Sequence, residues 1–69
     1  QLIQNNKAKA MDFFILNTEN YPNSFNAFDS LGEGYESIGE NEKAIENYTK
    51  SLELNPDNEH ARMKIETLI

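Results

Sequence analysis

Apolar side chains recur at intervals of three or four residues along most of this chain, an interval typical of one face of an α-helix. The clearest series comprises Phe28, Leu31, Tyr35 and Ile38. No segment alternates between apolar and polar residues with the period of two that a half-buried β-strand requires. The pattern therefore predicts an all-α chain.

Four helices are predicted from this pattern and its interruptions. They cover residues 6–19, 25–38, 42–54 and 59–68. Pro22 and Pro56 follow the first and third helices, and proline cannot continue a helix interior. Gly39 lies between the second and third helices, where a positive φ costs glycine little. Each helix is thus joined to the next by a short turn.

Short polar residues lie where the predicted helices begin. Asn23 or Ser24 is expected to cap the second helix, and Asn41 the third, by accepting a hydrogen bond from a backbone N–H that has no partner inside the helix. One stripe of each helix is expected to be buried. These stripes comprise Ala10, Phe13, Phe14 and Asn17; Phe28, Leu31, Tyr35 and Ile38; Ala44, Ile45, Tyr48 and Leu52; and Ala61, Ile65 and Leu68.

The sequence also repeats itself. A shift of 34 residues superimposes proline on proline, small residues on small ones and large residues on large ones. The pairs include Ala10 with Ala44, Phe14 with Tyr48, Pro22 with Pro56 and Ala27 with Ala61. The chain therefore reads as a single domain made of a half unit (residues 1–24), a full unit (25–58) and a final helix (59–69).

The full unit carries a specific motif, an aromatic residue-x2-Leu-Gly-x2-Tyr followed by Ala-x3-aromatic and a proline. Its residues are Phe28, Leu31, Gly32, Tyr35, Ala44, Tyr48 and Pro56. This motif resembles the tetratricopeptide repeat, a helix–turn–helix unit of 34 residues. The resemblance implies an antiparallel helix–turn–helix stack of four helices, in which Gly32 allows close packing. Glu66 stands where the next repeat glycine would lie, which implies a capping helix with one wet face.

Size and composition narrow the possibilities further. The chain has 69 residues and no cysteine, so it has neither a disulfide framework nor a thiolate metal site. We expect no cofactor. It has no apolar run near the roughly 20 residues that span a membrane, and we expect no membrane partner. The start, Gln1-Leu2-Ile3, suggests a fragment of a longer protein.

The charge is negative and unevenly spread. The net charge is −6, and residues 29–59 alone carry nine acidic residues against Lys43 and Lys50, which gives −7. Nucleic-acid binders show the opposite, a basic stripe, and anionic membrane surfaces attract basic segments. Nucleic acid is therefore not an expected partner.

We find no pattern that predicts catalysis. His60 is the only histidine and is expected to face solvent near the start of a short helix. The serines lack the strand and G-x-S-x-G turn that expose a nucleophile. Glu40, Glu42 and Glu46 fit a solvated helix face, without the pocket that acid–base chemistry needs. We expect this chain not to be an enzyme.

A polar stripe on the second predicted helix is a candidate binding surface. Its residues are Asn26, Asp29, Glu33 and Glu36, at spacings that place them on one helix face. The resemblance implies that these positions line a concave groove for peptides, continued by Ser37, His60, Met63 and Thr67. An acidic groove would favour a cationic or polar partner. The alternative is a face that only contacts water.

The first predicted helix is the second candidate surface, because it carries more apolar residues than one interface can bury. An exposed apolar patch marks an interaction site. We expect Ile3, Phe13, Ile15 and Leu16 to pack against upstream sequence of the same protein or against a second copy, which would form a homodimer.

Two functions remain open. The first is a protein–protein interaction or scaffold module. The second follows from residues 20–33, which resemble the C-terminal helical extensions of bacterial serine hydrolases of the β-lactamase-like or esterase type. That resemblance implies a structural tail that packs against a catalytic domain, in the bacterial cytoplasm or periplasm.

Overall fold

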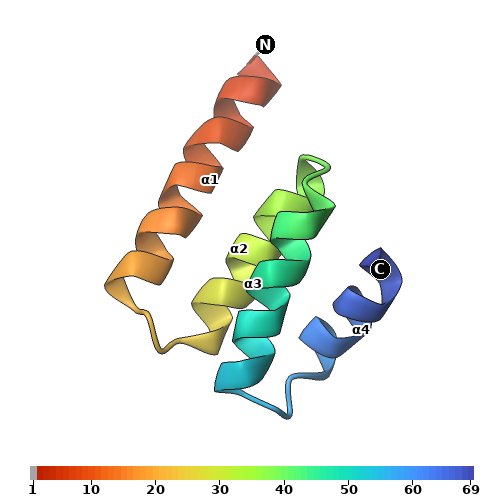
Figure 1. The fold of residues 1–69 in the computed structure, drawn as a ribbon. Helices are drawn as coiled ribbons and strands as arrows, with labels where there is room; N and C mark the ends of the chain where they lie inside the picture. The colour runs from red at the N-terminus through yellow and green to blue at the C-terminus, as the bar shows by residue number, and fades with distance from the viewer. Residues whose placement is uncertain (1) are drawn as a thin grey trace.

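The chain forms a stack of four α-helices. The computed structural model describes residues 2–69, with side chains described from residue 8 onward. The helices are α1 (Leu2–Asn20), α2 (Phe25–Ser37), α3 (Asn41–Leu54) and α4 (Glu59–Leu68). Residues 2–69 contain no β-strand. Each helix runs antiparallel to the one before it (Figure 1) and packs against it, most extensively at the α2–α3 contact. The all-α, antiparallel prediction is confirmed.

The predicted turn at Gly39 is confirmed, and its geometry sets where α3 begins. Gly39 has a φ of 82°. The Gly39 N–H donates to the Glu36 carbonyl oxygen, and the Glu40 N–H donates to the Tyr35 carbonyl oxygen. This pair of bonds is a Schellman motif, which satisfies carbonyl groups at the end of α2. Because the turn closes so tightly, Glu40 is the N-cap residue, and the prediction that Asn41 caps α3 is wrong.

The loops before α2 and α4 make the same capping hydrogen bond at equivalent positions, as the 34-residue shift predicts. Ser24 is the N-cap of α2, and its Oγ accepts from the Ala27 N–H at 3.3 Å. Asn58 is the N-cap of α4, and its Oδ1 accepts from the Ala61 N–H at 3.3 Å. Ala27 and Ala61 are both buried. The recurrence seen in the sequence is therefore also a recurrence of hydrogen bonds and burial.

The core lies between α2, α3 and α4. Ala44, Tyr48 and Ala61 are fully buried, and Ala27 and Leu31 are nearly so. The partly buried side chains packed against this cluster are Tyr35, Leu52, Ile65 and Leu68. Of the stripes predicted for these helices, the buried residues are Leu31, Ala44, Tyr48 and Ala61, and the half-buried ones are Phe28, Tyr35, Ile45, Leu52, Ile65 and Leu68. Ile38 is exposed, because it lies beyond the last turn of α2 as its C-cap residue.

The buried stripe of α1 is only partly the predicted one. Ala10 and Phe13 are exposed, and Phe14 and Asn17 are half-buried. Met11 and Thr18 are buried in their place. The physical reason is that α3 contacts helices on two sides, α2 and α4, whereas α1 packs against α2. Positions of α1 that correspond to the α2-facing side of α3 are therefore less buried: Ala10 is exposed, and Phe14 and Asn17 are only half-buried.

Two glycines allow α2 to approach both of its neighbours. A Cβ atom added to Gly32 would lie 2.9 Å from the Tyr48 ring on α3. A Cβ added to Gly34 would lie 2.7 Å from the Met11 sulfur and 2.9 Å from the Phe14 ring on α1. The close-packing role expected of Gly32 is confirmed. Gly34 plays the same role toward α1.

Ser51 joins three helices through one buried hydroxyl. Its Oγ donates to the Phe25 carbonyl oxygen of α2 at 2.8 Å and accepts from Asn58 Nδ2, in the cap of α4, at 2.9 Å. The side chain is fully buried. Because a buried hydroxyl without partners is costly, these two bonds explain why a polar residue is tolerated here.

We predict that Gly32→Ala destabilises the fold more than Gly34→Ala. The Tyr48 ring is fully buried and cannot withdraw, so the first change should lower the free energy of unfolding by about 1–3 kcal/mol. A Cβ at position 34 would meet the Met11 sulfur, near the end of a flexible side chain, and the Phe14 ring, which is only half-buried and can shift. Since alanine favours a helix over glycine by about 1 kcal/mol in both variants, the second change should cost less. Urea unfolding followed by circular dichroism measures both. Equal stability of the two variants would contradict this account of α2 packing.

Candidate functional site

The polar stripe of α2 faces charged residues of α4, with Tyr48 of α3 beside both. Asp29 and Glu33 contact His60, and Glu36 contacts Lys64 and Tyr48. We call these six residues the α2–α4 polar network. It joins three helices through side-chain contacts.

His60 bridges two carboxylates of α2. Its Nδ1 lies 3.0 and 3.1 Å from the two carboxylate oxygens of Asp29, and its Nε2 lies 3.2 Å from Glu33 Oε2. Ionised carboxylates only accept hydrogen bonds, so Nδ1 donates to Asp29 when it carries the proton, and the Nε2 contact with Glu33 is an ion pair when the imidazole is charged. The ring also packs edge-on against Tyr48, with centroids 5.9 Å apart.

Glu36 is held by two donors. The Tyr48 hydroxyl donates to Glu36 Oε1 at 2.9 Å, and Lys64 Nζ donates to Oε2 at 3.2 Å. Burial raises the pKa of the Tyr48 hydroxyl well above its ordinary value, and the hydrogen bond to Glu36 and the neighbouring carboxylates act in the same direction. The hydroxyl is therefore a fixed donor at the base of the polar network.

The structure brings most of the predicted groove residues onto α2 and α4. Asn26, Ser37 and Met63 are exposed there, and the Ser37 hydroxyl donates to the Gly34 carbonyl oxygen at 2.7 Å. His60, which was expected to face solvent, is half-exposed and bridges Asp29 and Glu33. Sequence reasoning missed Lys64, although it lies one helical turn after His60 and so on the same face.

These contacts change the electrostatic picture of the stripe. Asp29 and Glu36 are largely covered, with side chains 17% and 29% exposed, whereas that of Glu33 is 56% exposed. All three acids thus have partners within the fold, and Glu33 is the most exposed of them. No group of histidine and acidic residues in the described part of the chain is placed to hold a metal ion.

The apolar surface of α1 is exposed in part. Phe13 is 64% exposed and Leu16 is 53% exposed, while Ile15 is half-buried. The side chain of Ile3, which was assigned to the same surface, lies outside the described side chains. Phe13 and Leu16 are therefore the residues of this predicted surface that solvent reaches.

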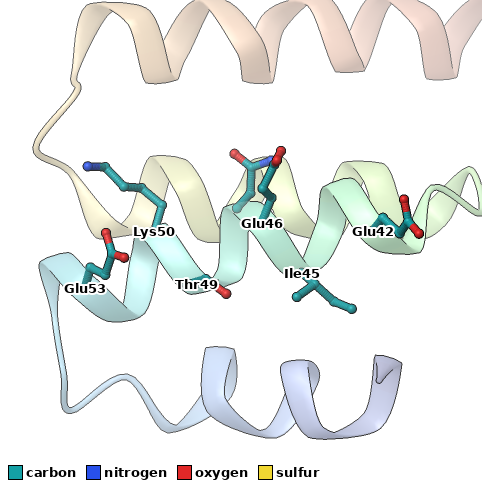
Figure 2. A pocket seen from close by; sticks show the side chains of 7 residues that line it. Glu42, Ile45, Glu46, Thr49, Lys50 and Glu53 are labelled. Atoms are coloured by element: carbon teal, nitrogen blue, oxygen red, sulfur yellow. The ribbon is translucent and has the colours of Figure 1, made fainter.

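A shallow depression lies over α3 on a different side. Figure 2 shows its side chains fanning outward from a single helix rather than converging between helices. They are Glu42, Ile45, Glu46, Asn47, Thr49, Lys50 and Glu53. Lys50 Nζ lies 6.0 Å above the Phe28 ring. Since one helix supplies the whole lining, we regard it as solvated helix surface, not as a binding site.

Comparisons with protein-family models, with curated proteins and with solved structures gave no match. No helix within residues 2–69 has the length and apolar character that a membrane crossing requires.

We predict that Tyr48→Phe changes how stability depends on alkaline pH. The folded chain keeps the Tyr48 proton that the unfolded chain loses near pH 10.0. The contribution of this group is therefore fully present below pH 10 and falls as the pH rises further, by up to about 1.4 kcal/mol per pH unit. The variant should lose about 0.5–1.5 kcal/mol at neutral pH and show a shallower decline above pH 10.

Urea unfolding at a series of pH values measures this, with Tyr21→Phe as the control because Tyr21 is an exposed tyrosine. A Tyr48→Phe variant whose stability declines as steeply as that of the unmodified chain would argue against a Tyr48 proton retained by folding.

Proposed function

We propose that this chain is a non-catalytic protein–protein interaction or scaffold module of the tetratricopeptide type, and that it binds a protein or peptide on the face shared by α2 and α4. The observation that carries the proposal is the α2–α4 polar network. The 34-residue recurrence of caps and buried alanines supports the assignment to repeats of this type.

The network supports binding because it fixes side chains before a partner arrives. His60 is held by Asp29 and Glu33, and Glu36 is held by Tyr48 and Lys64. Side chains that are already ordered lose little conformational entropy on association. The groups of this face therefore present a defined pattern of charge to a partner.

The exposed groups beside the network suggest the chemistry of the partner. Glu33 offers a half-exposed carboxylate. Met63, one helical turn after His60, is 62% exposed, and methionine adapts to apolar side chains of varied shape. A segment that places a lysine or arginine next to an apolar residue would complement both groups.

A structural role is the second candidate, favoured by the exposure of Phe13 and Leu16 on α1. In that case the chain is a tail that packs on a catalytic domain, as in the bacterial serine hydrolases that residues 20–33 resemble. The two functions use different surfaces. Substitutions on α2 and α4 should affect the first, and substitution of Phe13 should affect the second.

We predict that a fluorescent peptide of alternating lysine and leucine binds the chain, and that Glu33→Gln and Met63→Ser each weaken it about fivefold, which corresponds to about 1 kcal/mol. Fluorescence anisotropy gives the Kd, which should rise with salt because the contact is partly electrostatic. Glu46→Gln is the matched control, since it removes the same charge from α3, away from this face (Figure 2).

Equal weakening by Glu46→Gln would mean that the peptide responds only to net charge, and the proposal would fail. Equal binding of a peptide of alternating glutamate and leucine would also exclude it.

A further inference from the structure

Comparison of residues 34 positions apart shows that a face of α3 is packed against another helix, whereas the equivalent face of α1 is not. On α3, Ala44, Tyr48 and Ser51 are fully buried. Their equivalents on α1 are Ala10, which is exposed, and Phe14 and Asn17, which are half-buried. The same positions of two equivalent helices are thus less buried on α1, and the identical pair, Ala10 and Ala44, shows the largest difference.

The cover on α3 is α2, and its contacts are specific. Gly32 lets α2 approach the Tyr48 ring, and the Ser51 hydroxyl donates to the Phe25 carbonyl oxygen. At the edges, Lys43 Nζ lies 5.9 Å from the centre of the Tyr35 ring, and Lys50 Nζ lies 6.0 Å from that of Phe28. A covering helix of this kind therefore has a glycine in its middle and an aromatic ring on each side of it.

The corresponding face of α1 suits such a helix at least as well. Phe13 takes the place of Asn47, and Leu16 takes the place of Lys50. Both are more than half exposed. On α3 the equivalent positions lie at the edge of the α2 contact, with Asn47 half-buried and Lys50 exposed above the Phe28 ring. The edge of this face is thus more apolar on α1 than on α3, so a helix docked there would remove more apolar surface from water.

A second copy of this chain does not supply a matching helix. Its α2 already packs against α1 and α3 through Gly34 and Gly32. Its α4 has Glu66 at the position equivalent to Gly32, and a glutamate side chain would hold the helix away from Phe14. The copy therefore offers no free helix with a glycine at the required place.

We infer that the outward face of α1 docks a helix of the α2 type, running antiparallel to α1, with a glycine opposite Phe14 and aromatic side chains to either side. The face comprises Lys9, Ala10, Phe14 and Asn17, with Phe13 and Leu16 at its edge. This surface is separate from the α2–α4 face, so it can be occupied while a partner is bound there.

The test supplies the helix in the register that the fold itself uses. Residue 41 is equivalent to residue 7, so a second copy of residues 25–40 replaces residues 1–6 and leads directly into Lys7. The extended chain should gain helix content by circular dichroism and unfold with a Tm at least about 5 °C higher, because Phe13, Leu16 and Ala10 become covered. No gain in helix content, or no rise in Tm, would overturn the inference.

The Ala10→Gln variant distinguishes an added helix that packs on α1 from one that forms without contacting α1. Ala10 is exposed in the unmodified chain, and glutamine is a good helix former, so this variant should leave its Tm within about 1 °C. In the extended chain the glutamine would replace the equivalent of fully buried Ala44, and the Tm should fall by about 4–8 °C. Equal effects in both chains would overturn the inference.

Analytical ultracentrifugation tests whether a second copy of the chain binds the outward face of α1 instead. The unmodified chain should sediment as a monomer at micromolar concentration. A dimer that Ala10→Gln disrupts would make a second copy the occupant and overturn the inference. Peptide binding at the α2–α4 face is measured separately, so failure of either proposal leaves the other intact.

Discussion

The contact between the Tyr48 ring and the backbone of α2 at Gly32 is the constraint on which the structure depends. An added Cβ at Gly32 would lie 2.9 Å from that ring, so the two helices meet at a distance that any larger residue would increase. Interiors are packed as densely as organic crystals, and an increase here would disturb Ala44 and Ala61, which lie in the same cluster. Small residues are required at Gly32, Ala44 and Ala61 because larger side chains there would occupy the volume of the Tyr48 ring.

The same side chain links the core to the polar face. The Tyr48 ring lies edge-on to His60, and its hydroxyl donates to Glu36. The positions of Glu36 and His60 therefore follow from how deeply Tyr48 is buried. Core packing and the polar network are coupled through one residue, since a shift of the ring would move both charged groups at once.

The sequence predicted the α2–α3–α4 core well because the apolar period and the glycine turn are local signals that tertiary contacts reinforce. It predicted α1 poorly, since the shift of 34 residues assumed that Ala10 has the neighbours of Ala44. Only one side of the α2–α4 polar network could be predicted from the sequence. The stripe of Asp29, Glu33 and Glu36 could be found on one helix, but their pairing with His60 and Lys64 depends on how α4 lies across α2, which no local pattern encodes.

Ser51 has a wider consequence. Its oxygen is hydrogen-bonded both to the first turn of α2 and to the cap of α4, so it joins the start of one unit to the start of the next. An alanine would fill nearly the same volume yet would let the two helix ends slide independently. In an array of such units, small tilts add from unit to unit and define its curvature. A single buried hydroxyl group therefore helps to determine the shape of any longer superhelix built on this plan.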